Sequence, residues 1–246
     1  MLNPSYIQLS VVIPAFNEEL RLPGTLRHAV EYLAARPYTS EILIVDDGST
    51  DDTGQIVREW PPSTVPVRLL THPDGRNHGK GAAVKRGMLS AQGAFRLFMD
   101  ADNSTTVDQV ERFCGFFEKG YDLVIGSRSV PGSRVEVHQP IYKELAGRLG
   151  NWIIRVVAVP GISDTQAGFK MFTRECAEEV FGRLTVDRWG YDIEVLAIAR
   201  CRGYRIREIP ITWINAPGSK VGLSSYLEVL AETVRIRRNM SAGRYQ

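Results

Sequence analysis

The sequence has few of the residues that would indicate a disulfide-stapled, zinc-binding or membrane-spanning protein. It contains three cysteines, Cys114, Cys176 and Cys201, and their spacing fits neither a disulfide framework nor a zinc site. No apolar run approaches the ~20 residues that span a bilayer, and the most apolar stretch, Trp152–Val159, is interrupted by Arg155. The first ten residues lack the basic and apolar regions of a signal peptide. We therefore expect a protein of a reducing, cytoplasmic compartment.

The chain also lacks a strong charge of one sign. Its 30 Lys and Arg oppose 28 Asp and Glu, for a net charge of +2, and no continuous basic tract argues for nucleic acid as a partner. The glycine-rich motifs of Rossmann dehydrogenases and P-loop NTPases are missing, and the four histidines lie outside known nucleophile or zinc-hydrolase motifs. These absences disfavour an oxidoreductase, an NTPase and a covalent hydrolase. The 246 residues suffice for one domain with a sizeable core.

What is present is an alternation of short apolar runs with helical patterns. Buried strands are predicted at Leu9–Ala15, Glu41–Val45, Val65–Leu70, Phe95–Met99 and Asp122–Gly126. Helices are predicted at Leu20–Ala35, Thr50–Trp60, Lys80–Ser90 and Thr106–Glu118. This order is typical of an α/β fold, in which a mostly parallel sheet carries helices on both faces. In such sheets, ligands bind beyond the carboxyl ends of the strands.

The second half of the chain has a different pattern. It predicts a strand at Ala167–Thr173, helices at Glu175–Phe181 and Asp192–Cys201, an alternating strand at Tyr204–Trp213, and a closing helix at Leu223–Arg238. In the closing helix we expect an inward stripe formed by Leu223, Leu227, Leu230 and Val234. The tail, Ser241–Gln246, is expected to be frayed.

The segment Ile141–Val157 carries an apolar stripe flanked by basic residues, which are Lys143, Arg148 and Arg155. This pattern is typical of a helix that lies in a membrane interface. A helix packed against the protein core gives the same pattern, so both interpretations stay open.

Two aspartates, Asp100 and Asp102, flank a single residue at the end of a predicted strand. Residues two apart in an extended chain point the same way, so both carboxylates face one side. A pair of this kind suits Mg²⁺ or Mn²⁺, which prefer oxygen ligands, and Ser104 would add a neutral oxygen. The alternative is a solvated loop with a helix cap.

Other polar clusters also follow predicted strands. Asp46 with Asp47, and Asn17 with Glu18, could contact a nucleoside or form ordinary turns and caps. Lys80 lies in a glycine-bracketed segment before a helix, where backbone N–H groups favour a phosphate, although a flexible loop with a solvated lysine is the alternative.

Two arginines, Arg128 and Arg134, follow the fifth predicted strand. They could clamp a second anion, or they could simply be surface residues. The sequence spacing alone does not assign a role to five further residues, Asp164, Lys170, Trp189, Asp192 and Glu194.

Taken together, these motifs resemble the family 2 glycosyltransferases of the GT-A fold. The resemblance rests on VVIPAFNEE at Val11–Glu19, IVDDGST at Ile44–Thr50, NHGKGAAVKRG at Asn77–Gly87 and MDAD at Met99–Asp102. The stretches DTQAGFKMFT, RWGYDIEVL and GSKV are similar to those of polyprenyl-phosphate glycosyltransferases, above all the dolichyl-phosphate glucosyltransferases. The resemblance extends from Ser10 to Arg238 and implies one GT-A catalytic domain, with a nucleotide-binding half at 1–126 and an acceptor-binding half at 127–246.

The resemblance also implies roles for individual residues. On the donor side, it assigns Pro14, Ala15, Asn17, Glu18, Asp46 and Asp47 to the nucleoside, Lys80 to the nucleotide, and Asp100 with Asp102 to the metal and diphosphate. Ser104 stands where relatives often have Gln, so the third metal ligand stays open. On the acceptor side, it assigns Arg128 and more weakly Arg134 to a phosphate, and Asp164, Lys170, Trp189, Asp192 and Glu194 to the sugar and acceptor site. Ser219 and Lys220 would lie on a loop that closes over this site.

The implied reaction is the inverting, Mg²⁺- or Mn²⁺-dependent transfer of glucose from UDP-glucose to a polyprenyl phosphate. A phosphate monoester has a second pKa near ~6 and is largely a dianion at neutral pH, so it needs no general base. Three alternatives remain open, namely GDP-mannose as donor, a soluble or glycan hydroxyl acceptor with Asp164 or Asp192 as base, and nucleotide-sugar binding without turnover. The membrane helices of family members have no counterpart in this sequence, so we expect peripheral docking on the cytoplasmic face through 141–157.

Overall fold

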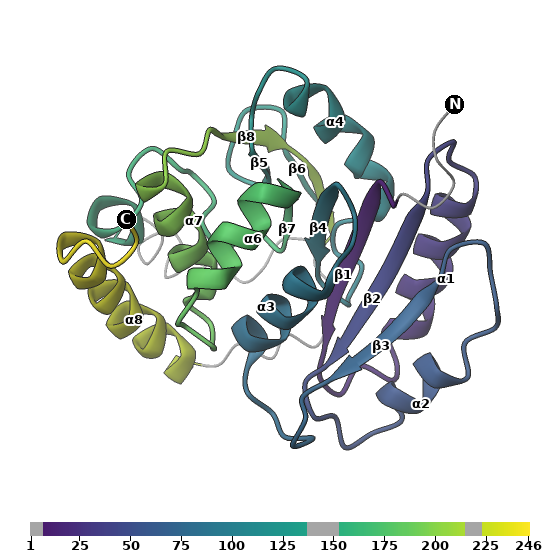
Figure 1. The fold of residues 1–246 in the computed structure, drawn as a ribbon. Coiled ribbons are helices and arrows are strands. Elements are labelled where there is room, and N and C mark those ends of the chain that lie inside the picture. Colours follow the sequence, from purple (N-terminus) through teal and green to yellow (C-terminus); the bar gives the residue numbers. More distant parts are fainter. Residues whose placement is uncertain (1–6, 137–152, 215–222) are drawn as a thin grey trace.

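A seven-stranded sheet forms the centre of the molecule, with the strand order β3-β2-β1-β4-β7-β5-β8 (Figure 1). The computed structural model describes residues 7–136, 153–214 and 223–246. The strands of this sheet are β1 (Leu9–Ala15), β2 (Ser40–Asp46), β3 (Val67–Thr71), β4 (Phe95–Met99), β5 (Leu123–Ser127), β7 (Phe169–Thr173) and β8 (Ile206–Pro210). The predicted α/β class with a mostly parallel sheet is confirmed.

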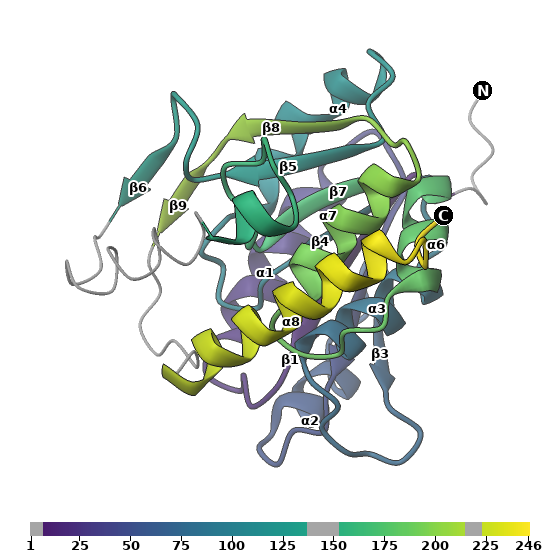
Figure 2. The ribbon, with the colours of Figure 1, turned by 90° about the vertical axis from the view of Figure 1, so that its left-hand side faces the viewer.

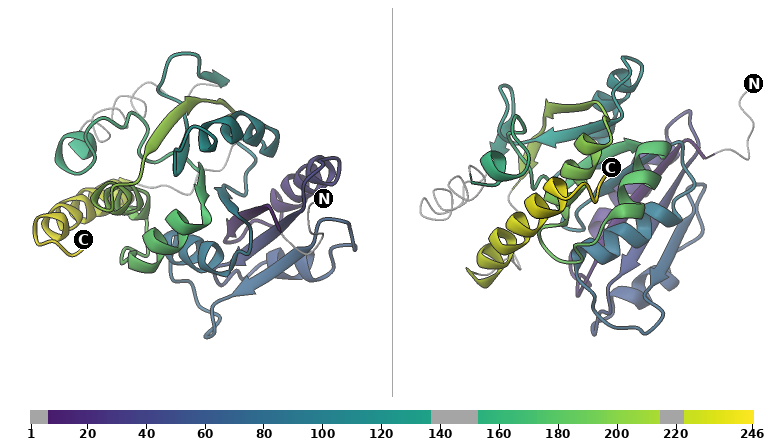
Figure 3. Two further views of the ribbon diagram at one scale, coloured as in Figure 1. Left: turned by 45° about the horizontal axis from the view of Figure 1, so that its top comes forward. Right: turned by 60° about the vertical axis from the view of Figure 1, so that its left-hand side comes forward.

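The helices lie in two layers, one on each face of the sheet. Their bounds are α1 (Leu22–Ala34), α2 (Thr53–Arg58), α3 (Lys80–Ser90), η1 (Val107–Val110), α4 (Glu111–Phe117), α6 (Arg174–Arg183), α7 (Tyr191–Cys201) and α8 (Leu223–Ser241). The left view of Figure 3 places the yellow α8 and the purple α1 at opposite ends of the molecule, with the sheet between them. The predicted helix Lys80–Ser90 matches α3, whereas the helix predicted at Thr50–Trp60 forms only over Thr53–Arg58.

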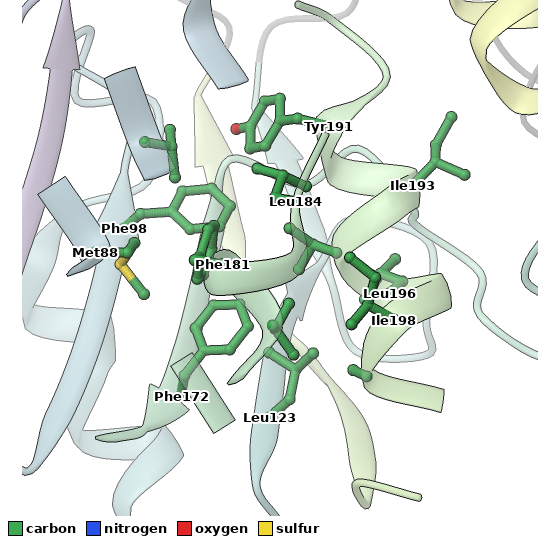
Figure 4. Packing of buried hydrophobic residues seen from close by; sticks show 14 of the residues in the cluster. Met88, Phe98, Leu123, Phe172, Phe181, Leu184, Tyr191, Ile193, Leu196 and Ile198 are labelled. Carbon is green, nitrogen blue, oxygen red and sulfur yellow. The ribbon is translucent and has the colours of Figure 1, made fainter. Parts of the chain in front are cut away.

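Strand residues alternate between two apolar cores. In β1, Val11 and Ile13 join the core under α1 and α4, while Val12 joins the core under α3, α6 and α7. This alternation follows from the period of two in a strand, and each β1 residue is fully buried because the sheet is covered on both faces. Figure 4 shows the second core, where Phe98 and Phe172 of neighbouring strands lie against Phe181 of α6.

One strand, β7, runs antiparallel to both of its neighbours, β4 and β5. The other pairs of this sheet are parallel. Because β7 is reversed, its first residue lies at the edge where the parallel strands end, and Phe169 is paired with Met99. Residues that precede β7 therefore meet residues that follow β1, β2, β4 and β5.

The single strand predicted at Tyr204–Trp213 is wrong in one respect, because it is divided into two. The strand β8 pairs with β5, and β9 (Thr212–Ile214) pairs instead with β6 (Arg134–Glu136) in a separate two-stranded sheet. Pro210 ends β8 and has no N–H to donate. The side chain of Gln109 then binds both backbone groups of Thr212, at 2.7 and 2.8 Å, and so holds the turned chain.

The inward stripe predicted for the closing helix is wrong in phase. Leu227 and Val234 are 70% and 48% exposed, whereas Val229, Thr233 and Ile236 are buried. The sequence pattern failed because the buried face of α8 includes a polar residue. The Thr233 hydroxyl donates to the Val229 carbonyl within the helix, at 2.7 Å, and so its burial leaves no unpaired donor.

The tail predicted to be frayed is instead anchored. Tyr245 is 2% exposed, and its hydroxyl donates to Glu194 at 2.5 Å. The predicted helix Ile141–Val157 lies mostly outside the described residues, which include only its last part. In the part of the chain that is described, no helix is both long enough and apolar enough to cross a membrane.

Candidate active site

The ends of β1 and β2 form one side of the site. Asp47 follows β2, and its carboxylate accepts from the backbone N–H groups of His78 and Gly79, at 2.8 and 2.9 Å. Its own N–H donates to the Ala15 carbonyl at 2.8 Å. Asp46 accepts from the Ser49 N–H at 2.9 Å, closing a turn. The carboxyl ends of both strands are therefore tied to the loop that precedes α3.

The residues after β1 are held against the same turn. Asn17 has a positive φ of 51°, and its side chain accepts from the Thr50 N–H at 2.8 Å. The next residue, Glu18, forms a bidentate pair with Arg21 at 2.6 and 2.7 Å. The pKa of Arg21 is raised, first by its hydrogen bond to Glu18 and further by the nearby charges of Asp102 and Asp100. Arg21, which the sequence analysis did not assign to the site, thus lies beside the aspartate pair.

Lys80 and Asp100 meet at the centre of the site. The Lys80 ammonium donates to Asp100 Oδ1 at 2.6 Å, and both side chains keep about a third or less of their surface exposed, at 27% and 32%. Burial alone would lower the pKa of Lys80, but the charges of Asp100 and Asp192 outweigh it and raise that pKa. The lysine therefore carries its charge at the first turn of α3, where backbone N–H groups also favour an anion.

Asp102 lies in a tight turn that Asn103 makes possible. Asn103 has a positive φ of 57°, and Asp102 accepts from the Ser104 N–H at 2.9 Å. The Ser104 hydroxyl is buried and has no hydrogen-bond partner among the described residues. No three His, Cys, Asp or Glu side chains within the described ranges converge as a complete metal site. Two carboxylates and an unpaired hydroxyl are hard oxygen donors that fit a divalent cation completed by water and ligand oxygens.

Arg128 and Asp164 form a bidentate ion pair at the end of β5. The guanidinium donates to the carboxylate twice at 2.8 Å, and the Arg128 backbone N–H donates to it at 2.9 Å. Burial alone would raise the pKa of Asp164, but the Arg128 charge outweighs it and holds that pKa below its usual range. The Arg128 side chain is 32% exposed, whereas Asp164 is 5% exposed. The Arg128 guanidinium is therefore partly open to solvent while the buried Asp164 carboxylate holds it, and it also lies over the Trp213 ring.

A second ion pair, between Lys170 and Asp192, lies beneath the site. Lys170 is fully buried, donates to Asp192 and to the Ala167 carbonyl, and lies over the Phe98 ring. Burial raises the pKa of Asp192, and the charges of Lys170 and Lys80 offset this only in part. Asp192 is thus paired with Lys170, and the charge of Lys80, which contacts Asp100, also acts on it.

The remaining predicted residues divide between the site and other places. Trp189 is half-buried and packs against the core of α6 and α7. Glu194 is fully buried, and its partners are Thr185, Val186 and Tyr245 rather than residues of the site. Arg134 is exposed on β6. Pro14 lies within β1. Ser219 and Lys220 lie outside the described residues.

Two residues that the sequence analysis did not single out also belong here. Gly168 accepts from the Asp100 N–H at 3.2 Å and leaves room for the Asp100 carboxylate. The Tyr191 hydroxyl is buried without a hydrogen-bond partner among the described residues, and Figure 4 shows it directed away from the labelled apolar side chains. Both residues lie within stretches that carry the family resemblance, which was the available signal, but neither is a residue type that spacing rules identify.

The fold and the site define a glycosyltransferase. The family model for glycosyl transferase family 2 matches residues 10–181, and the chain belongs to this family. Among its relatives, it is 36% identical over 241 residues to a dolichyl-phosphate beta-glucosyltransferase (ALG5D) of Trichomonas vaginalis, which covers 94% of this chain and 73% of that protein. It is 34% identical over 257 residues to the human dolichyl-phosphate beta-glucosyltransferase, which covers 97% of this chain and 78% of that protein.

Solved structures share the fold at lower identity. Glucosyl-3-phosphoglycerate synthase from Mycobacterium tuberculosis, crystallised with UDP, superposes with a TM-score of 0.67 at 19% identity, over 94% of this chain and 80% of that one. A mannosyltransferase from Pyrobaculum calidifontis, in complex with GDP-Man and Mn²⁺, superposes with a TM-score of 0.63 at 20% identity. The match covers 98% of this chain and 66% of that one. The expected GT-A fold is therefore confirmed.

Proposed function

We propose that this protein transfers glucose from UDP-glucose to the phosphate of a polyprenol such as dolichol, with inversion at the sugar. The observation that carries the proposal is one continuous polar edge of the sheet. At this edge an aspartate pair with a lysine faces the ends of β1, β2 and β4, and Arg128 stands at the end of β5. The aspartate pair with its lysine suits a nucleoside diphosphate bound through a metal, and Arg128 suits a phosphate acceptor. The similarity to dolichyl-phosphate beta-glucosyltransferases supports this assignment.

On the donor side, Asp46, Asp47 and Asn17 would face the nucleoside, and Lys80 would face the diphosphate. The geometry supports this because Asp47, which follows β2, accepts from the two backbone N–H groups that directly precede Lys80 at the start of α3. The lysine charge at the N-terminal end of α3 supplies positive potential for phosphate oxygens.

A divalent metal would be held by Asp100 and Asp102, with Ser104 as a further oxygen donor. The unpaired Ser104 hydroxyl and the two carboxylates are consistent with this donor set. When bound, such a cation supplies positive charge that offsets the charge developing on the departing diphosphate.

On the acceptor side, the phosphate would bind at Arg128. Asp164 holds this guanidinium in a fixed orientation, because two of its N–H groups and its backbone N–H are already bound to the carboxylate. A phosphate oxygen would form the new bond to the anomeric carbon while the bond from that carbon to the UDP oxygen breaks. The phosphate is largely ionised at neutral pH and supplies its own electron pair.

The ion pairs also argue against a hydroxyl acceptor. A hydroxyl nucleophile needs a general base. Although burial opposes it, the Arg128 charge lowers the pKa of Asp164, which makes Asp164 a poor base. Burial raises the pKa of Asp192, but its carboxylate is only 6% exposed and is bound to Lys170 rather than open to an acceptor. A phosphate acceptor needs neither residue as a base. Docking at a membrane surface would follow from a lipid acceptor, and the segment predicted to provide it lies mostly outside the described residues.

A phase-partition assay tests the proposal. The protein is incubated with Mn²⁺, UDP-[¹⁴C]glucose and either a short-chain polyprenyl phosphate or soluble sugars, and the label is followed into the organic or the aqueous phase. We expect label in the organic phase only with polyprenyl phosphate, and about 10²- to 10³-fold less of it with Asp102→Asn. Transfer to soluble sugars at a comparable rate would contradict the proposal, and replacing the donor with GDP-mannose tests the sugar nucleotide.

A further inference from the structure

A buried carboxylate, Glu194 of α7, connects the C-terminal tail to the segment that precedes this helix. Glu194 Oε2 accepts from the N–H groups of Thr185 and Val186, at 2.8 and 2.7 Å. Its Oε1 accepts from the Thr185 hydroxyl at 2.7 Å and from the Tyr245 hydroxyl at 2.5 Å. Glu194 and Tyr245 are 0% and 2% exposed, so solvent replaces none of these bonds. Four donors from two distant segments thus converge on one carboxylate that the proposed reaction does not use.

The helix α8 holds the same segment from its other side. Asn239 donates to the Tyr245 hydroxyl at 3.1 Å, and Arg235 donates to the Thr185 hydroxyl at 3.2 Å. One helical turn earlier, Glu232 accepts from the Gly190 N–H at 2.7 Å. In Figure 2, α8 passes in front of α7. Residues 185–190 are therefore tied at both ends to α8 and the tail.

This segment in turn packs directly against the start of α3. The Asp187 carbonyl accepts from the Ala82 N–H at 3.0 Å. A Cβ at Gly79 would lie 2.6 Å from the Asp187 carbonyl oxygen, and one at Gly81 would lie 2.6 Å from that of Val186. At both glycines the nearest atom is a backbone oxygen, which cannot move aside as the end of a flexible side chain could. A shift of residues 186–187 would therefore displace the first turn of α3, which carries Lys80.

We propose that Glu194 and Tyr245 are positioning residues for the donor diphosphate. They fix the backbone at 185–187, this backbone fixes the first turn of α3, and that turn places Lys80 2.6 Å from Asp100. Neither residue touches the donor. The inference rests on the proposed function in one respect, namely that the donor diphosphate lies at Lys80. It gives the anchored C-terminal tail a role in catalysis at a distance from the reacting atoms.

The test compares Tyr245→Phe with a matched control, Tyr204→Phe. Tyr245→Phe keeps the buried ring and removes the hydroxyl that donates to Glu194 and accepts from Asn239, whereas the Tyr204 hydroxyl makes an exposed contact of 3.5 Å to the Glu175 carbonyl. UDP affinity is measured by calorimetry in Mn²⁺, and hydrogen exchange is followed at the Ala82 amide. We expect Tyr245→Phe to weaken UDP binding about three- to tenfold, which is less than the full effect of losing a hydrogen bond to a charged group, because the loss reaches Lys80 only through the backbone at 185–187. Ala82 should exchange faster, and the control should change neither quantity.

A split of kinetic constants separates positioning from general stability. In Tyr245→Phe, KM for UDP-glucose should rise while KM for polyprenyl phosphate stays at the wild-type value. If Tyr245→Phe lowers the melting temperature but leaves UDP affinity and Ala82 exchange unchanged, the residue is merely structural and the inference is wrong. Asn239→Ala, which removes one partner of the Tyr245 hydroxyl, provides a milder second variant that should shift UDP affinity in the same direction. If wild-type protein binds UDP but does not glucosylate polyprenyl phosphate, the proposed function fails while these binding and exchange measurements still decide the positioning role.

Discussion

The Asp100 carboxylate occupies the space where a side chain at Gly168 would begin. A Cβ placed on Gly168 would lie 1.9 Å from Asp100 Oδ2 and 2.5 Å from its Cγ. This close approach exists because β7 runs antiparallel to β4, so that the residues just before β7 meet those just after β4. The reversed strand therefore shapes the aspartate pair without contributing a polar side chain to it.

Gly168→Ala should abolish transfer while leaving the fold largely intact. The added methyl group forces the Asp100 carboxylate away from Lys80 and from the proposed metal position, and we expect kcat/KM for UDP-glucose to fall by about 10²-fold or more, as misplacement of a catalytic group does. Gly182→Ala in α6 is the matched control, because nothing lies within 4 Å of its Cβ position. Circular dichroism should be unchanged for both variants. Full activity in Gly168→Ala would show that Asp100 need not hold its present position.

Asp102→Asn should remove most activity by weakening metal binding. The substitution keeps the acceptor oxygen that closes the turn onto the Ser104 N–H, but it removes the charge that a divalent cation requires. We expect a loss of about 10²- to 10³-fold in kcat, similar to the removal of other groups that stabilise developing charge. Raising the Mn²⁺ concentration should restore part of it. Asp108→Asn, an exposed substitution on η1, should behave as wild type. Wild-type turnover by Asp102→Asn in the presence of a chelator would exclude the metal role.

The Arg128–Asp164 pair should stabilise the fold at neutral pH and lose this effect in acid. Although burial opposes it, the Arg128 charge sets the pKa of folded Asp164 below the unfolded value of ~3.9. A depressed pKa in the folded state gives stability that is fully present above the unfolded pKa and is lost as the pH falls through the folded value. Urea unfolding of wild type and Asp164→Asn should therefore differ at pH 7, and the difference should begin to shrink as the pH falls below ~3.9 and vanish only below the lower pKa of folded Asp164. A difference that persists undiminished at pH 3 would contradict this assignment.

The sequence predicted the centre of the parallel sheet well, because β1, β2, β4 and β5 are buried on both faces and are almost continuously apolar. The predicted bounds of Leu9–Ala15 and Phe95–Met99 are those of β1 and β4. The motifs at the end of β4 and at the start of α3 identified Asp100 and Lys80 as candidate site residues. Their direct contact is seen only in the structure. The antiparallel direction of β7 could not be read from its composition, since an apolar strand has no directional signal.

The other limits of the sequence reasoning concern polar residues inside the protein. The family resemblance assigned both Asp192 and Glu194 to the sugar and acceptor site, but a helix places residues two apart on different sides. The phase of α8 was missed because Thr233 and Asn239 are buried, which a pattern of apolar residues does not register. Tyr245 was assigned to a frayed tail because a single aromatic near a terminus carries no spacing information. For Glu194 and Tyr245, the missing information was that each is the other's distant hydrogen-bond partner.

Lys170 and Asp192 should be strongly coupled in their effect on stability. Lys170→Met leaves Asp192 buried without its cation, which should cost about 3–5 kcal/mol in the free energy of unfolding. Asp192→Asn leaves the lysine charge without its partner and should also destabilise. The double variant should lose less than the sum of the two, by about 0.5–3 kcal/mol, because the unpaired charge is then absent. Additive losses in a double-mutant cycle measured by urea unfolding would show that the two side chains act independently.

Substitutions along α8 should follow the observed buried face rather than the sequence-based stripe. Ile236 is 0% exposed and Leu227 is 70% exposed, although the pattern of leucines placed Leu227 inside. Ile236→Ala should therefore cost about 2–5 kcal/mol, because it removes buried methyl groups and leaves a cavity. Leu227→Ala should change the free energy of unfolding by less than about 0.5 kcal/mol, as surface substitutions usually do. Chemical denaturation of the two variants decides the phase of the helix, because the predicted stripe requires the larger loss at Leu227.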